Sequence, residues 1–138
     1  METPYVNYDT ALLLKRNGFD EECFNSFEYF RSSVTLYTGW LPEYHNHPVE
    51  NSMDVIKRPK IQDGITWLVE KHNILVTPYA CSLGWYFEIY DLNERDITGC
   101  KALYKIGIPS KDLVKPSFLK AAEEGLAYAL KNFVKNEQ

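Results

Sequence analysis

Two histidines separated by one asparagine come closest to a chemical motif in this chain. His45 and His47 stand at positions i and i+2 of a segment bounded by prolines. In an extended segment both imidazole rings would point the same way, so they could ligate one metal ion. A third ligand would have to come from farther away. The side chains that could supply it are those of Glu43, Glu50, Asp54 and His72.

A metal-dependent hydrolase or nuclease that uses His45 and His47 is therefore one functional hypothesis. The segment spells His-Asn-His, but the nucleases named after these letters disperse the three residues over a ββα unit, whereas this chain has them side by side. A polar loop with two solvated histidines is the simpler interpretation. The metal-dependent enzyme stays an alternative, and we expect no metal or other cofactor.

The cysteines and the known catalytic motifs add no second candidate for catalysis. Cys23, Cys81 and Cys100 are odd in number, widely spaced and without a CxxC pair, which favours neither a disulfide framework nor a zinc knuckle. Each lies in an expected strand, where buried and inert thiols are common. The chain contains no GxSxG, P-loop or GxGxxG motif. The sequence thus leaves enzymatic activity uncertain and favours a non-catalytic protein.

Length and charge limit the partners that we expect. The 138 residues suffice for one domain with its own core. The net charge of −4 and the absence of a block of like charge argue against a nucleic-acid partner, because Lys and Arg supply most of the affinity for phosphates. No stretch approaches the ~20 apolar residues of a membrane helix, and the first residues do not resemble a signal peptide. We therefore expect a cytoplasmic protein with no membrane partner.

Periodicity and turn signals predict one α+β domain over residues 1–138, in the order α-β-β-(loop)-α-β-β-β-α. We expect a two-layer sandwich in which the helices pack on an antiparallel sheet. Residues 39–58 show no periodicity and predict a long irregular loop. The expected helices cover residues 11–16, 59–72 and 117–134, and the expected strands cover 23–30, 34–38, 74–81, 85–92 and 100–106.

Single residues refine this outline. Asp9 is the expected N-cap of the first helix, and Gly18 ends it. Pro59 suits the first position of the second helix. Pro78 is expected to place its strand at an edge of the sheet or on a bulge. Trp67 points away from the apolar stripe of the second helix, so either another element covers it or it is exposed for a partner.

Aromatic residues predict a contact surface. They make up 14% of the chain, and ten of them are tyrosines, whose apolar ring and polar tip suit interfaces as well as cores. In the strand at 85–92, alternation places Tyr86, Glu88 and Tyr90 on one face. Together with Trp40 and Tyr44 of the long loop, these residues form the expected interaction surface. The expected partner is a protein, either a second copy of this chain or another molecule.

An RNA-binding module is the second alternative. Residues 60–134 are expected to run α-β-β-β-α, which is the order of a double-stranded-RNA-binding domain. Such domains grip phosphates through lysines at the start of their second helix. Lys111, Lys115 and Lys120 lie near that position here, but they form no compact cluster and Asp112 lies between them.

Three stretches together resemble a known group of sequences: ALLLKRNGFDEEC at 11–23, GITWLVEKHNI at 64–74, and WYFEIYDL at 85–92 followed by a terminal helix with AEEGL at 122–126. The layout is similar to small uncharacterised proteins of phage and prophage regions in Bacteroidetes. The resemblance covers most of the chain apart from residues 39–58. It implies a small cytoplasmic accessory protein on mobile genetic material, and it implies no activity, cofactor or site residue.

Overall fold

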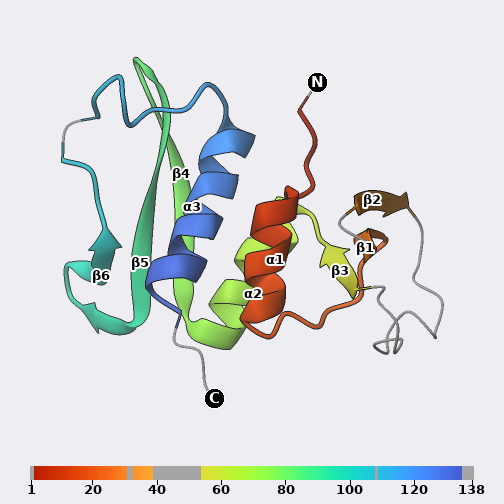
Figure 1. Cartoon of the computed structure of the whole chain (residues 1–138). Coiled ribbons are helices and arrows are strands. Elements are labelled where there is room, and N and C mark those ends of the chain that lie inside the picture. The colour runs from red at the N-terminus through yellow and green to blue at the C-terminus, as the bar shows by residue number, and fades with distance from the viewer. Residues whose placement is uncertain (1, 31–32, 39–53, 108, 135–138) are drawn as a thin grey trace. The chain divides into compact units, whose positions relative to one another are not determined.

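The computed structural model of the chain describes residues 2–30, 33–38, 54–107 and 109–134. These residues form three helices and two antiparallel three-stranded sheets, with the strand orders β2-β1-β3 and β4-β5-β6 (Figure 1). The elements, in chain order, are α1 (Tyr8–Arg16), β1 (Asn25–Phe30), β2 (Ser33–Thr38), β3 (Asp54–Arg58), α2 (Ile61–His72), β4 (Ile74–Cys81), β5 (Gly84–Asp96), β6 (Gly99–Tyr104) and α3 (Phe118–Asn132).

The α+β class and the packing of helices on antiparallel sheets are confirmed. The main difference from the expected order is β3, because Asp54–Arg58 was assigned to the irregular loop. The remaining part of that loop, 39–53, lies outside the described residues. Because β3 pairs with β1, the first hairpin completes a sheet of its own and does not join β4, β5 and β6. The chain accordingly divides into two compact units.

The N-terminal unit, Tyr5–Lys60, begins with α1. The N-cap of this helix is Asn7 and not Asp9, because the Asn7 side chain accepts a hydrogen bond from the Thr10 amide at 2.9 Å. Asp9 lies in the first turn, where a negative charge favours the helix dipole. Gly18 ends the helix as expected, with a φ of +90° that glycine adopts without strain.

The sheet of this unit has β1 at its centre. β1 pairs antiparallel with β2 and with β3, so Phe27 lies between Leu36 and Ile56 across the sheet. Ile56 is fully buried, and α1 packs on β3. Cys23 was expected in β1 but precedes it, because the strand begins at Asn25.

Arg58 connects β3 to β1 and to the segment before α1 through its guanidinium group. The group lies 5.1 Å from the ring centroid of Phe27 and 5.5 Å from that of Tyr5, and its Nε donates to the Val6 carbonyl at 2.7 Å. Pro59 is not the first residue of α2, since its carbonyl accepts from the Val6 amide at 3.0 Å and the helix begins at Ile61.

The C-terminal unit comprises residues 2–4 and the chain from Ile61 onward. In it α3 crosses the faces of β4 and β5, and α2 packs on α3 and β4 (Figure 1). The face of α3 that carries Ala122, Leu126, Ala129 and Leu130 is buried. Trp67 of α2 is 3% exposed, so the interpretation that it is covered is confirmed. No helix in the described part of the chain is long and apolar enough to cross a membrane.

The three strands of this unit follow the predicted meander with two changes. β5 continues to Asp96, beyond the expected end of the strand at residue 92, and the turn lies at Ile97 and Thr98. Register shifts in the pairing of β5 with β6 accompany this extension. Pro78 lies in β4, which is an edge strand as predicted.

Gly125 allows the close approach of α3 to the sheet. A Cβ atom at this position would lie 2.6 Å from Cγ1 of Val76 and 2.9 Å from Cγ of Phe87, closer than carbon atoms can pack. On the same side of the sheet, Tyr104 stacks on Phe87 with ring centroids 5.0 Å apart and meets Tyr128 of α3 at 4.7 Å. The face of β5 that carries Phe87 is therefore the face covered by α3.

We expect Gly125→Ala to lower the free energy of unfolding, although alanine favours helices by about 1 kcal/mol over glycine. Overpacking against Val76 and Phe87 costs about 1–3 kcal/mol and outweighs that preference. Urea unfolding monitored by circular dichroism measures the change. Gly107→Ala is the control, because a Cβ atom there meets nothing within 4 Å. Equal stability of the Gly125 variant and the parent would contradict the packing described here.

Candidate functional site

The tyrosine face is the surface of the β4-β5-β6 sheet that lies opposite α3. Successive side chains of a strand point to opposite faces, so residues next to Phe87 and Ile89 in β5 point away from the helix. Residues paired across β4 and β5 share a face. The tyrosine face thus consists of Leu75, Thr77 and Tyr79 from β4 and Tyr86, Glu88 and Tyr90 from β5.

Tyr79 and Tyr86 form a stacked pair across the two strands. They are paired in register, and their ring centroids lie 5.6 Å apart with an interplanar angle of 25°. Tyr79 is 38% exposed and Tyr86 is half-buried. The pair therefore presents aromatic surface to solvent at a place where the strands hold both rings in position.

Glu88 and Tyr90 are joined by a hydrogen bond beside that pair. They are two residues apart on one strand, and the Tyr90 hydroxyl donates to Oε1 of Glu88 at 2.7 Å. Glu88 was expected to be exposed, but only 6% of it is. It lies on the central strand of the sheet, with Thr77 of β4 as its cross-strand partner. The result is a buried carboxylate that accepts a hydrogen bond from a phenol group.

This carboxylate changes the acidity of the neighbouring phenols. The hydrogen bond to Glu88, burial and the charge of Glu88 together raise the pKa of Tyr90 far above its ordinary value. Burial, followed by the charge of Glu88, also raises the pKa of Tyr86. Loss of either proton would place a phenolate beside a carboxylate. Both hydroxyl groups consequently remain protonated donors at any physiological pH.

The sequence prediction omitted Tyr79, although the sequence contained the signal that locates it. The turn at Ser82 and Leu83 is a two-residue loop between Cys81 and Gly84, which pair with each other. Counting outward from that loop pairs Tyr79 with Tyr86. The tyrosine face could have been extended to β4 by this count.

The other predicted site residues fall outside the described part of the chain. Trp40 and Tyr44, the loop aromatics of the expected surface, lie within 39–53, as do His45 and His47. The metal hypothesis and the loop half of the expected surface therefore stay predictions. Among the residues that are described, no group of three His, Cys, Asp or Glu side chains could hold a metal ion.

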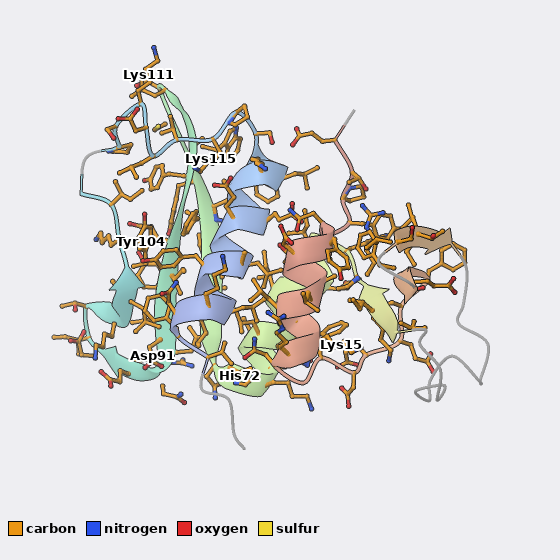
Figure 2. All side chains as sticks on the ribbon, in the orientation of Figure 1. Lys15, His72, Asp91, Tyr104, Lys111 and Lys115 are labelled. Atoms are coloured by element: carbon orange, nitrogen blue, oxygen red, sulfur yellow. The ribbon has the colours of Figure 1, made fainter. Side chains whose placement is uncertain are left out.

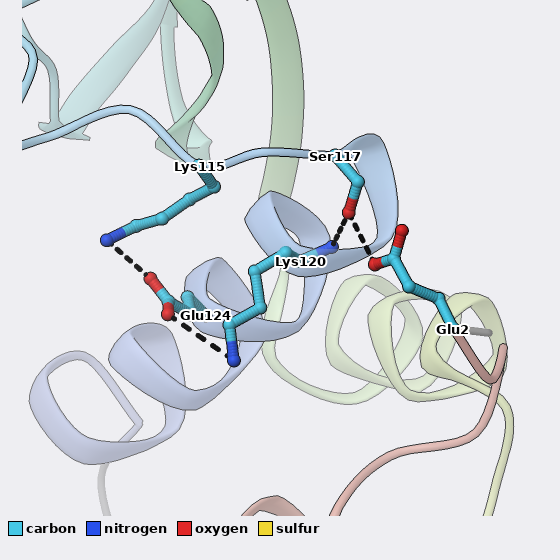
Figure 3. Close-up of polar contacts among 5 residues, drawn as sticks. All are labelled: Glu2, Lys115, Ser117, Lys120 and Glu124. Carbon is cyan, nitrogen blue, oxygen red and sulfur yellow. Dashed lines mark hydrogen bonds and ion pairs between the residues drawn. The ribbon is translucent and has the colours of Figure 1, made fainter.

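Two lysines of the RNA hypothesis, Lys115 and Lys120, lie around the start of α3 (Figure 3). Lys115 Nζ lies 2.7 Å from one oxygen of Glu124, and Lys120 Nζ lies 3.8 Å from the other. Ser117 caps the helix by accepting from the Lys120 amide at 3.1 Å, and its hydroxyl donates to Glu2.

Two of the three lysines thus share one carboxylate. Lys111 extends into solvent beyond this cluster (Figure 2). The α-β-β-β-α order that suggested RNA binding is confirmed, but the two lysines nearest the helix start are both paired with Glu124.

We expect the Tyr90 hydroxyl to lose its proton only at a pH well above 10, which is about the ordinary pKa of tyrosine. NMR of tyrosine labelled with carbon-13 at Cζ measures this titration. Tyr90→Phe identifies the signal. Glu88→Gln should move the midpoint back toward the ordinary value, whereas Glu94→Gln, an exposed change on the same strand, should not. An ordinary midpoint in the parent protein would contradict the Tyr90–Glu88 hydrogen bond.

The same shift predicts how stability depends on pH. Tyr90 of the unfolded chain loses its proton near pH 10, while that of the folded chain keeps it. The unfolded state then binds fewer protons, so the free energy of unfolding should fall as the pH rises above about 10. Urea unfolding of the parent and of Tyr90→Phe at a series of alkaline pH values measures this fall, which should be smaller in the variant.

Comparisons with known proteins assign this chain to no group. No family model matches it, and neither a curated protein nor a solved structure does. The resemblance of its sequence to phage and prophage proteins accordingly stays a prediction. Inferences about function rest on the geometry of the described residues.

Proposed function

We propose that this chain is a non-catalytic binding module that contacts a protein partner through the tyrosine face. The observation that carries the proposal is the clustering of Tyr79, Tyr86 and Tyr90 around Glu88, opposite the helix-covered side of the sheet. Tyrosine supplies large contact area with few rotatable bonds, and a few such side chains dominate the binding energy of many interfaces. Rings that strands already hold in place lose little entropy on binding.

The acid–base properties of the cluster favour binding over catalysis. A tyrosine that acts as a general base or nucleophile needs a phenolate, and therefore a lowered pKa. Glu88 has the opposite effect on Tyr86 and Tyr90, since it raises the pKa of both. The phenols can donate hydrogen bonds, which suits recognition of a partner.

Charge favours a protein over a nucleic acid as the partner. A carboxylate lies at the centre of the tyrosine face and would repel phosphates, and the chain carries a net charge of −4. At the start of α3, Lys115 and Lys120 already pair with Glu124. Both surfaces therefore offer phosphate groups less attraction than an RNA-binding domain does.

We place this role in the cytoplasm, as an accessory function on mobile genetic material. The location rests on the composition of the sequence, and the accessory role rests on its resemblance to phage and prophage proteins. The partner is a second copy of this chain or another protein of the host or phage.

We expect the double substitution Tyr79→Ser and Tyr86→Ser to abolish partner binding and leave the fold intact. Sedimentation velocity tests self-association, and capture from host lysate with quantitative mass spectrometry tests binding to other proteins. Ile97→Ser is the matched control, because it removes a fully exposed apolar side chain from a hairpin turn elsewhere in the same unit.

The outcomes separate binding from folding. Loss of one interaction in the double variant, with a parent-like circular dichroism spectrum and full binding by the Ile97 control, supports the proposal. Unchanged binding by a folded double variant would contradict the proposal. If the double variant unfolds, the tyrosines belong to the core and the proposal also fails.

A further inference from the structure

We propose that the tyrosine face receives an arginine side chain of the partner, with the guanidinium group paired to Glu88 and stacked on the outer face of the Tyr79–Tyr86 ring pair. This inference rests on the proposed protein-binding function and names the chemistry that the partner must present. It follows from the charge of the face, the geometry of its rings and the hydrogen bonding of its carboxylate.

The first argument is electrostatic. Glu88 is 6% exposed, and its hydrogen-bond partner is the neutral hydroxyl of Tyr90. Within the described residues, no Lys or Arg side chain forms an ion pair with Glu88. Removing a carboxylate from water is costly unless a cation or several hydrogen bonds compensate for it. A cation from the partner would supply the compensation that the described part of this chain does not.

The second argument concerns the rings. The π face of an aromatic ring attracts cations within about 6 Å of its centroid. Tyr79 and Tyr86 stack on each other on the face that carries Glu88, so a cation can stack only on an outer face of the pair. A group that satisfies both features must be positively charged and able to lie flat against an aromatic ring.

Arginine fits this description better than lysine. Its guanidinium group is planar and weakly hydrated, stacks on aromatic rings and donates in a fork that matches a carboxylate. Each carboxylate oxygen has two lone pairs. The donation from Tyr90 to Oε1 of Glu88 therefore leaves both oxygens able to accept from a guanidinium group. An ammonium group would make the ion pair but would lack the planar stacking.

A nucleobase is the competing occupant, since any base can stack on tyrosine. Its phosphates, however, would approach the charge of Glu88 and gain no compensating cation on the tyrosine face. Stacking of a base alone would leave the Glu88 carboxylate without a cation. An arginine side chain can use both features, because its guanidinium group stacks on a tyrosine ring and pairs with the Glu88 carboxylate.

The test is an NMR titration of the full chain with a capped pentapeptide that has one arginine among glycines. The matched peptides replace arginine by citrulline, which has the same shape without the charge, or by lysine. We expect the arginine peptide to shift the amide signals of Tyr86, Glu88 and Tyr90 in a saturable manner. Glu88→Gln should weaken this binding about tenfold or more, as the loss of a charged hydrogen-bonded pair predicts. Glu94→Gln should leave it unchanged.

Several results would overturn the assignment. Binding of the citrulline or lysine peptide as tight as that of the arginine peptide would do so, and so would equal binding by Glu88→Gln and the parent. Displacement of the peptide by a short oligouridylate that shifts the same tyrosine signals more strongly would favour the nucleobase instead. If Glu88→Gln fails to fold, Tyr86→Leu serves in its place, because it removes one of the stacked rings and should also weaken binding.

The two proposals can fail separately. If the Tyr79 and Tyr86 serine variant loses its partner but no arginine peptide binds, the tyrosine face is a protein-binding surface for other chemistry and only the arginine assignment falls. If the arginine peptide binds but partner binding survives the serine substitutions, the proposed function falls.

Discussion

The contact between Gly125 and the sheet determines which side chains this protein can offer to a partner. α3 lies so close to Phe87 and Val76 that no side chain fits at position 125. Because strand residues alternate between two faces, this one contact assigns the residues of β5 from Trp85 to Asp91 to the covered or the open side. A shift of one residue in register would bury Tyr86 and Tyr90 and expose Phe87. Packing on one side of the sheet thus defines the candidate site on the other.

Local pattern predicted those parts of the fold that local interactions determine. The alternation at 85–92 and the two-residue loop before it define β5 and its pairing with β4. The five residues of β3 carry no comparable signal. This strand forms by pairing with β1, where Phe27 pairs with Ile56 some thirty residues farther along the chain. The N-cap was misplaced by two residues because Asn7 and Asp9 are both good caps, and it is the Asn7 side chain that accepts from the Thr10 amide.

The residues of the candidate site were predictable in outline, but the burial and pairing of the charged side chains were not. Tyr86, Glu88 and Tyr90 were expected on one face, and the structure places them there. Glu88 is buried on the central strand beside its β4 partner Thr77, and a single-strand pattern does not contain this neighbour. At the start of α3, the pairing of Lys120 with Glu124 follows from helical spacing, whereas Lys115 reaches the same carboxylate from the preceding loop.

Pro78 has a consequence for how two copies of this protein can meet. Alternation from the pair that closes the hairpin, Cys81 with Gly84, turns the Pro78 nitrogen toward the free edge of β4. An incoming strand would find no amide hydrogen there, so the edge resists extension of the sheet into a fibre. An open aromatic face beside an unprotected edge would be an aggregation hazard. With this edge interrupted, association along β4 is restricted to side chains, which can change by substitution while the backbone stays the same.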